Sequence, residues 1–269
     1  MHQSVAYGLS QRSPSERYYY LSIDEKAVQK GHSYISILSD EQTGIVIDVV
    51  EGRSDDSVDE LCQTSLTQTQ RDAVKSVCTD MWQPFIKGVS AYFSNALHCH
   101  DNFHIVKYLN KAVDKCRRRE AKQNDALKRT KYLFLKDKMN LTDEQYFKFE
   151  SIRKANYEVS RAWQVKENFR DILFIQTPER ASTIYGMWRK NALNVNIKEI
   201  NEVVEIFDRH QKGIINAITT GANNSRAERL NGSIQELKTI GRGYRNIENF
   251  RIAILFFHGN LEVIPHKKE

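Results

Sequence analysis

The sequence predicts an α/β protein: a mixed β-sheet with flanking helices, interrupted by a large all-helical insertion before a late helix that rejoins the sheet domain. Runs rich in aromatic and β-branched residues fill the first part of the chain, as strands require. Strand and helix patterns then alternate up to about residue 110, which is typical of parallel strands joined by helical crossovers. From there to about residue 220, apolar residues recur at three-four spacing, which predicts helices.

The first strands form a predicted antiparallel meander. Its three runs are 18–23 (YYYLSI), 33–38 (SYISIL) and 45–50 (IVIDVV), separated by short breaks. Asp24 directly follows the first run, and we take it as the end of that strand. A helix is expected to start at Asp55, because Val58, Leu61, Cys62 and Leu66 would then share one face.

The second part of the sheet is predicted from residues 73–110. Residues 73–79 form a short strand that ends at Asp80, and residues 84–93 have helical spacing. A strand at 98–100 then leads into a helix that starts near Asp101. This order of strand, helix, strand and helix predicts parallel pairing.

The expected domain organisation follows from these patterns. Residues 1–17 are predicted to be a poorly structured segment, 18–110 with 221–269 one sheet domain, and 111–220 a helical insertion. A late helix carries Glu228, and a final apolar helix around 250–255 is expected to pack back on the sheet.

Composition narrows the class of protein. Of the 269 residues, 40% are hydrophobic and 28% charged, as in an ordinary folded globular chain. No apolar run approaches the ~18 residues of a membrane span, and the first 20 residues have no apolar core of a secretory signal. The cysteines form no CxxC pair, which disfavours a zinc site and indicates thiols in a reducing compartment. We therefore expect a cytoplasmic protein and no membrane partner.

Positive charge is concentrated in one stretch. The whole chain carries +6, whereas residues 107–138 contain twelve Lys and Arg against four Asp and Glu, a local balance of +8. Such a run is either a solvated helix face or a contact for phosphate backbones. Together with a late basic turn, it supplies the candidate DNA-binding residues: Lys107, Lys111, Arg117, Arg118, Arg119, Arg242 and Arg245.

Three carboxylates occupy positions where they could act together. Asp24 and Asp80 follow the first and fourth predicted strands, and Glu228 lies in the late helix. Taken singly, an Asp at a strand end is more often a turn former. The order of the elements, however, is that of a ribonuclease-H-like fold, in which the first and fourth strands are neighbours. Carboxylates are preferred ligands of Mg²⁺ or Mn²⁺, and two such ions can promote phosphoryl transfer.

Several motifs resemble the ISL-three-type family of insertion-sequence transposases. Asp80-Met81-Trp82 matches an Asp-Met-Trp box, and residues 101–110 (DNFHIVKYLN) match the tract that follows it. Residues 23–34 and 224–231 look like the first and third acidic boxes, and 243–246 (GYRN) matches a later Gly-aromatic-Arg-Asn tract. The similarity runs from about residue 20 over nearly the whole chain.

This resemblance implies a function. The family's DDE triad falls on Asp24, Asp80 and Glu228, with Mg²⁺ or Mn²⁺ as cofactor and with transposon ends and target DNA as partners. It also implies a homodimer or larger active assembly at the bacterial nucleoid. The cysteine-rich zinc region and helix-turn-helix of family members have no counterpart in these 269 residues, so we expect mainly non-specific DNA binding. A non-catalytic DNA-binding remnant and a nuclease of the same fold are the alternatives.

Other residues have plainer interpretations. Trp82 could shape the metal site or stack on a base, but core packing is the expected role. Asp101 is expected to cap a helix, and His98 with His100 is not assigned a metal. Nucleotide-binding glycine motifs and the Gly-x-Ser-x-Gly motif do not occur, which disfavours nucleotide-driven enzymes and triad hydrolases.

Overall fold

The computed structural model describes residues 1–28, 33–136, 140–173, 178–220, 225–244 and 246–263, without the side chains of 178 and 225–228. The chain forms two compact units. The sheet unit comprises Met1–Asp101 with Asn223–Glu269, and the helical unit comprises Asn102–Ala222. In the described parts of the chain, no helix has both the length and the apolar character needed to cross a membrane.

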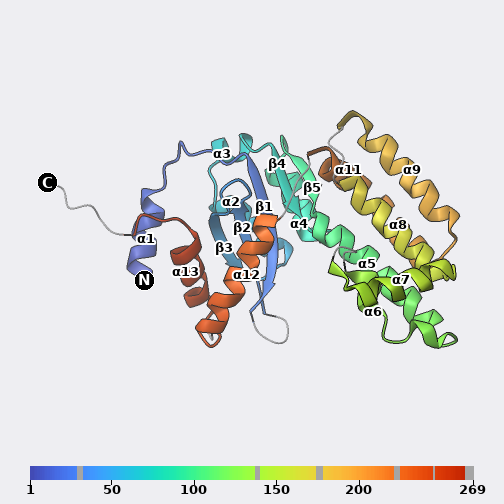
Figure 1. Cartoon of the computed structure of the whole chain (residues 1–269). Coiled ribbons are helices and arrows are strands. Elements are labelled where there is room, and N and C mark those ends of the chain that lie inside the picture. The colour runs from blue at the N-terminus through green and yellow to red at the C-terminus, as the bar shows by residue number, and fades with distance from the viewer. Residues whose placement is uncertain (29–32, 137–139, 174–177, 221–224, 245, 264–269) are drawn as a thin grey trace. The chain divides into compact units, whose positions relative to one another are not determined.

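The sheet unit contains a five-stranded mixed sheet in the order β3-β2-β1-β4-β5 (Figure 1). The first three strands are an antiparallel meander, as the sequence predicts, and β4 and β5 continue the sheet in parallel from β1. The strand bounds are β1 Tyr20–Ala27, β2 Tyr34–Asp40, β3 Val46–Glu51, β4 Ser76–Thr79 and β5 Leu97–His100.

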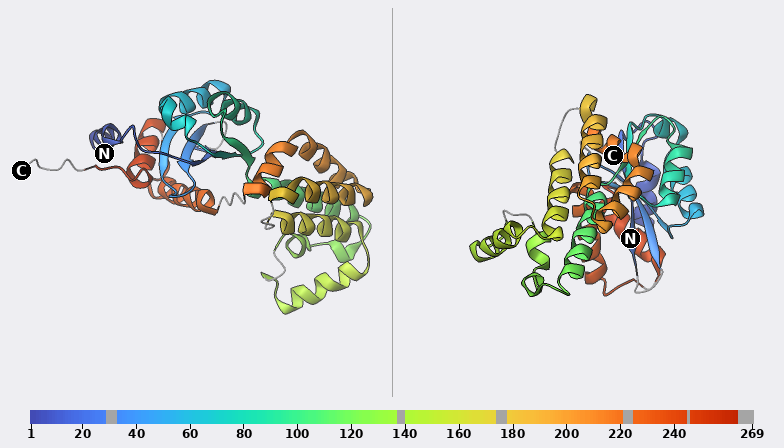
Figure 2. Two further views of the ribbon diagram at one scale, coloured as in Figure 1. Left: turned by 90° about the horizontal axis from the view of Figure 1, so that it is seen from above. Right: turned by 90° about the vertical axis from the view of Figure 1, so that its right-hand side faces the viewer.

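Helices cover both faces of this sheet, as the view from above shows (Figure 2, left). On one face lie α2 (Asp55–Thr64) and α4 (Gln83–Tyr92), with the short α3 (Gln68–Asp72) nearby in the chain. On the other face lie α12 (Ser225–Ile240) and α13 (Ile247–His258). Side chains of a strand point alternately to the two faces of the sheet. On one face, Leu21, Ile23 and Val77 pack with α2 and α4.

The layer of α2 and α4 depends on local sequence features. Ser54 caps α2 by accepting a hydrogen bond from the backbone of Ser57. Gly88 of α4 lies so close to Val58 of α2 that a Cβ at position 88 would stand 2.4 Å from a Val58 methyl group. The two helices therefore approach closely because position 88 lacks a side chain.

The second layer includes a segment that the sequence did not identify. The prediction of a poorly structured 1–17 is wrong for its first part, because α1 (His2–Gln11) is a helix. Val5 is buried in the same apolar cluster as Phe250 of α13. Arg12 then donates hydrogen bonds to the β3 carbonyls of Val46 and Ile47. Tertiary contacts of one valine and one arginine order a segment whose own apolar pattern is weak.

Every element described in the helical unit is a helix. Its core contains a tightly packed aromatic group, in which the Phe169 ring lies 4.6 Å from Trp188 and 5.4 Å from Phe207. The bounds are α5 Asn102–Glu120, η1 Asp125–Leu127, α6 Lys131–Leu135, α7 Asp143–Lys154, α8 Glu158–Leu173, η3 Pro178–Arg180, α9 Ala181–Asn194, α10 Lys198–Arg209 and α11 Gln211–Thr220.

The boundary between the units differs from the expected one at its first crossing. The sequence placed it between residues 110 and 111, inside the single continuous helix α5, whereas the units divide after Asp101. Periodicity locates a helix but does not reveal which core it packs against. That is decided by α5 contacts with α8 and α10.

Candidate active site

Asp24 and Asp80 occupy corresponding positions beside two neighbouring parallel strands, β1 and β4. The parallel pairing of β1 with β4 ends at Ile23 and Thr79. The next residue in the sequence is Asp24 in the first case and Asp80 in the second. The expectation that Asp24 ends its strand is wrong, because β1 continues to Ala27, paired with Tyr34 of β2. Asp80 does follow the end of β4. The pair thus lies where β1 loses its parallel neighbour.

Backbone and side-chain donors orient both carboxylates. Asp24 Oδ1 accepts a hydrogen bond from the backbone N–H of Glu25 at 2.7 Å, and its Oδ2 accepts one from Asn231 Nδ2 at 2.5 Å. Asp80 Oδ1 accepts a hydrogen bond from the backbone N–H of Trp82 at 2.9 Å. These bonds restrict the rotation of both carboxylates.

Helix α12 is fastened to β1 beside this pair. Lys26 Nζ donates to the backbone carbonyl of Asn231, and Lys238 Nζ donates to that of Ala27 at 3.1 Å. Leu230 and Ile234 of α12 are buried in the core under the sheet. Burial lowers the pKa of Lys26, and the neighbouring Asp24 carboxylate partly opposes that shift. The three-four spacing of apolar residues therefore sets the rotation of α12 about its axis. In this rotation Asn231 faces Asp24.

The third sequence-predicted carboxylate, Glu228, belongs to α12, three positions before Asn231. Its side chain lies outside the described part of the structure. Positions three apart in a helix are neighbours on one face. Among the described residues, no three His, Cys, Asp or Glu side chains gather as a metal-binding group.

Arg53 has two aromatic neighbours, and one of them is Trp82, two residues after Asp80. Gly52, at φ +92°, turns the chain after β3, so that Arg53 returns toward β2. The Arg53 guanidinium lies 3.8 Å from the centre of the Tyr34 ring and 5.0 Å from that of Trp82. Glu25 accepts two hydrogen bonds from Arg53, at 2.9 and 3.0 Å, and this bonding raises the pKa of Arg53.

Trp82 does not have the expected role in core packing. Its side chain is 39% exposed, and its indole N–H donates to the carbonyl of Arg53 at 3.0 Å. The ring precedes α4 as its N-cap residue, outside the apolar cluster beneath that helix. The prediction failed because indole size favours burial on average, whereas here the position at the helix start keeps the ring at the surface.

The candidate DNA-binding residues of α5 fall into two groups. Lys107, Lys111 and Arg118 are exposed, and Arg118 forms an ion pair with Asp114 at 3.3 Å. Arg117, by contrast, is buried, donates two hydrogen bonds to Asp114 and one to the carbonyl of Leu127. Of the late candidates, Arg242 is exposed, and Arg245 lies outside the described residues.

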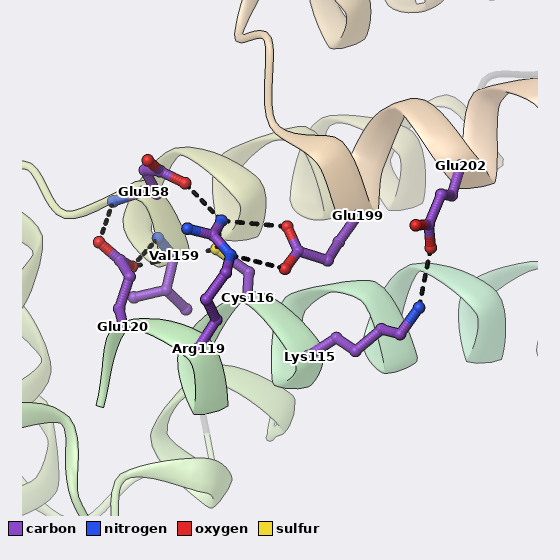
Figure 3. A network of polar contacts seen from close by, with 8 residues as sticks. All are labelled: Lys115, Cys116, Arg119, Glu120, Glu158, Val159, Glu199 and Glu202. Carbon is purple, nitrogen blue, oxygen red and sulfur yellow. Dashed lines mark hydrogen bonds and ion pairs between the residues drawn. The ribbon is translucent and has the colours of Figure 1, made fainter. Parts of the chain in front are cut away.

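Arg119 is the centre of a polar network inside the helical unit (Figure 3). It donates to both oxygens of Glu199, at 2.8 and 3.1 Å, and to Glu158 at 2.5 Å. The carboxylate of the adjacent Glu120 accepts hydrogen bonds from the first backbone N–H groups of α8, which belong to Glu158 and Val159. Arg119 and Glu120 thus join α5 to α8 and α10. One residue of the basic run, Arg119, therefore has a structural role in this unit.

Sequence reasoning did not assign a role to Asn231 or Arg53. Asn231 was part of the third acidic box, and its spacing of three from Glu228 could have marked it as sharing that helix face. Arg53 has no such signal, because its approach to Tyr34 and Trp82 depends on the turn at Gly52 and on strand register.

The chain is similar in sequence to known transposases. A model of the DDE transposase family of the ISL3 type, described as "Transposase", matches residues 21–254, which include Asp24, Asp80 and Glu228. The transposase for insertion sequence element IS1001 of Bordetella parapertussis is 26% identical over 250 residues, covering 90% of this chain. The transposase for IS1557 of Mycobacterium tuberculosis is 23% identical over 274 residues, covering 91%.

The chain spans 61% of the length of each of these relatives. The family match, in contrast, extends over most of the present chain and includes both the strands that carry the aspartates and the late helix. On this evidence, the protein belongs to the ISL3-type family of insertion-sequence transposases.

Proposed function

We propose that this chain is the catalytic part of an insertion-sequence transposase, with Asp24, Asp80 and Glu228 as its acidic triad in a ribonuclease-H-like domain. The observation that carries the proposal is the register of β1 and β4, in which Asp24 and Asp80 are the residues that follow the last parallel pair. Beside them, α12 bonds to Asp24 through Asn231. The helix position three residues before Asn231 is that of Glu228. Family membership supports the same three residues.

The donor set suits Mg²⁺ or Mn²⁺. These ions prefer carboxylate oxygens. Asp24 offers them from β1, whose backbone is fixed by sheet hydrogen bonds, and Asp80 offers them from the position directly after β4. Divalent ions of this kind would activate a water or a 3′-hydroxyl and stabilise the leaving oxygen in phosphoryl transfer. Asp24 and Asp80 would bind and orient, while Asn231 and the backbone N–H groups of Glu25 and Trp82 would keep the carboxylates in place.

The proposed substrates are the ends of the element and a target DNA. Cleavage of a phosphodiester would free a 3′-hydroxyl, which would then attack target DNA in strand transfer. The names of the two relatives support this substrate class, as do the exposed Lys107, Lys111 and Arg118. We further propose that the active complex holds two or more copies and works at the nucleoid of a bacterial cytoplasm.

Metal-dependent cleavage and joining test the proposal. Labelled element-end duplex is incubated with Mg²⁺ or Mn²⁺ and a target plasmid, using wild type, Asp24→Asn, Asp80→Asn and Glu228→Gln. We expect cleavage and joining with wild type and neither with the three variants. Asp72→Asn and Glu236→Gln, which change exposed acids elsewhere in the sheet unit, serve as controls and should remain active.

A second readout keeps the test independent of DNA. Mn²⁺ binding measured by electron paramagnetic resonance should weaken in Asp24→Asn and Asp80→Asn but not in Asp72→Asn. Cleavage without joining would favour the nuclease alternative. Neither metal binding nor cleavage by wild type would favour a non-catalytic DNA-binding remnant and refute the proposal.

A further inference from the structure

We infer that Trp82, backed by Arg53, is a stacking site for one unpaired base of the DNA strand held at Asp80. This inference rests on the function proposed above and names a contact for its substrate. It is carried by the exposure of Trp82, by the hydrogen bonds of this residue and by the guanidinium that lies over its ring.

Trp82 is exposed in a protein whose other tryptophans are buried. Trp163 and Trp188 are 2% and 3% exposed, whereas Trp82 is 39% exposed. Exposing a large aromatic surface to water is unfavourable, by about 25 cal/mol per Å² of apolar area. The energetic disadvantage is understandable if the ring is covered when substrate binds.

Two hydrogen bonds restrain Trp82. Its backbone N–H donates to Asp80 Oδ1, and its indole N–H donates to the carbonyl of Arg53. One end of the residue is therefore tied to a proposed catalytic carboxylate, and the other to the loop after β3. A ring fixed in this way loses little conformational entropy when a planar ligand stacks on it.

Arg53 favours a base over a phosphate as the ligand. Glu25 engages the guanidinium with two hydrogen bonds, so the charge of Arg53 is neutralised locally. Its Cζ lies over the rings of Tyr34 and Trp82, 3.8 and 5.0 Å from their centres. Neutralised guanidinium planes and aromatic rings bind nucleobases by stacking, with little dependence on sequence.

The base must be unpaired, because a base inside a duplex already has neighbours on both faces. Trp82 is two residues from Asp80, a reach of at most about 7 Å along an extended chain. A base stacked there would belong to a nucleotide close to the phosphate at the acidic pair. The site would hold the end of one strand apart from its complement while the phosphate is attacked.

Binding without divalent metal tests this contact separately from catalysis. Two single strands of equal length and charge are used, an oligothymidylate and an abasic strand with the same phosphates. We expect wild type to prefer the base-containing strand about tenfold, since stacking on an aromatic side chain contributes on the order of 1–3 kcal/mol per base. The same strand should quench the fluorescence of Trp82, and the abasic strand should not.

Variants assign the preference to this ring. Trp82→Ala should bind both strands equally, whereas Trp82→Phe should keep part of the preference and shows that the fold is intact. Tyr19→Ala is the matched control, because Tyr19 is also 39% exposed and has a cation, Lys75, 4.9 Å from its ring, but sits before β1. It should bind as wild type does.

The outcomes separate this inference from the proposed function. A base preference that survives in Trp82→Ala, or one that disappears in Tyr19→Ala, would overturn the stacking site. Asp80→Asn should lose cleavage yet keep the base preference. If wild type prefers bases but never cleaves DNA with metal, the transposase proposal fails while the stacking site stands.

Discussion

The side-chain amide of Asn231 on α12 donates a hydrogen bond to Asp24 Oδ2 on β1, 207 residues earlier in the chain. The same residue accepts a hydrogen bond from Lys26 Nζ through its backbone carbonyl. Asn231 therefore fixes both the orientation of Asp24, a candidate metal ligand, and the position of α12, the helix that carries Glu228, against β1.

Replacing Asn231 by alanine should impair metal-dependent cleavage more than folding. The backbone bond from Lys26 and the burial of Leu230 and Ile234 persist, so we expect a loss of about 1 kcal/mol in the free energy of unfolding. Asp24 would lose its side-chain donor, and Mn²⁺ affinity should fall at least several-fold. Urea unfolding and Mn²⁺ titration measure the two effects, with the exposed Gln235→Ala on α12 as control. Equal Mn²⁺ affinity in Asn231→Ala and wild type would remove Asn231 from the site.

Arg119→Ala should destabilise the helical unit. Glu199 has a side chain that is 7% exposed, and its hydrogen bonds to Arg119 hold its pKa below the ordinary value. Without Arg119 this carboxylate loses its main partner, at an expected cost of roughly 1–3 kcal/mol. Thermal unfolding, followed by the fluorescence of the buried Trp163 and Trp188, measures this loss of stability. Lys128→Ala, which breaks the exposed pair with Asp125, should change stability by less than about 0.5 kcal/mol.

Charge reversal at Arg118 should lower DNA affinity directly, whereas charge reversal at its neighbour Arg117 should first lower stability. Arg118→Glu reverses an exposed charge, so binding to random duplex should weaken and the slope of log affinity against log salt should become shallower by about one. Arg117→Glu would place a second carboxylate beside Asp114 in a buried setting and should lower thermal stability before DNA is added. Titrations at several salt concentrations, each paired with a melting curve, distinguish the two. Unchanged DNA affinity in a folded Arg118→Glu protein would exclude this residue from the DNA surface.

Glu41 should make the stability of the sheet unit depend on pH. Burial raises its pKa from 4.5 to about 7, with Asp101 and Asp40 adding to the shift and a hydrogen bond with Cys78 opposing it. The folded protein therefore binds this proton more tightly than the unfolded chain. The associated stability is fully present below about pH 4.5 and is lost as pH rises through 7.

Glu41→Gln should remove that loss. Relative to wild type, the variant should gain stability between pH 5 and pH 8, at about 1.4 kcal/mol per unit of pKa difference and about 3 kcal/mol at most. Urea unfolding at the two pH values measures it, with the exposed Glu60→Gln of α2 as reference. A parallel pH profile for Glu41→Gln and wild type would show that the buried carboxyl does not titrate in this range.

The sequence by itself determined most helices and strands of this protein and singled out its candidate acidic residues. Alternating apolar residues in 20–51 specify a meander because side chains of a strand point alternately to its two faces, and Asp24 and Asp80 are recognisable from their places in that order. Three-four spacing likewise marks the helices of 102–220, since it records which face of each helix is apolar.

Tertiary structure alone decided which side chains meet. Asn231 reaches Asp24, Arg12 orders α1 against β3, and Arg119 is committed to Glu199 and Glu158, although each pair is distant in sequence. Trp82 stays at the surface for the same kind of reason: the bond from its indole to the Arg53 carbonyl depends on the turn at Gly52. Local periodicity encodes burial, but hydrogen bonds between distant polar groups depend on strand register and helix rotation, which are fixed only when the whole core packs.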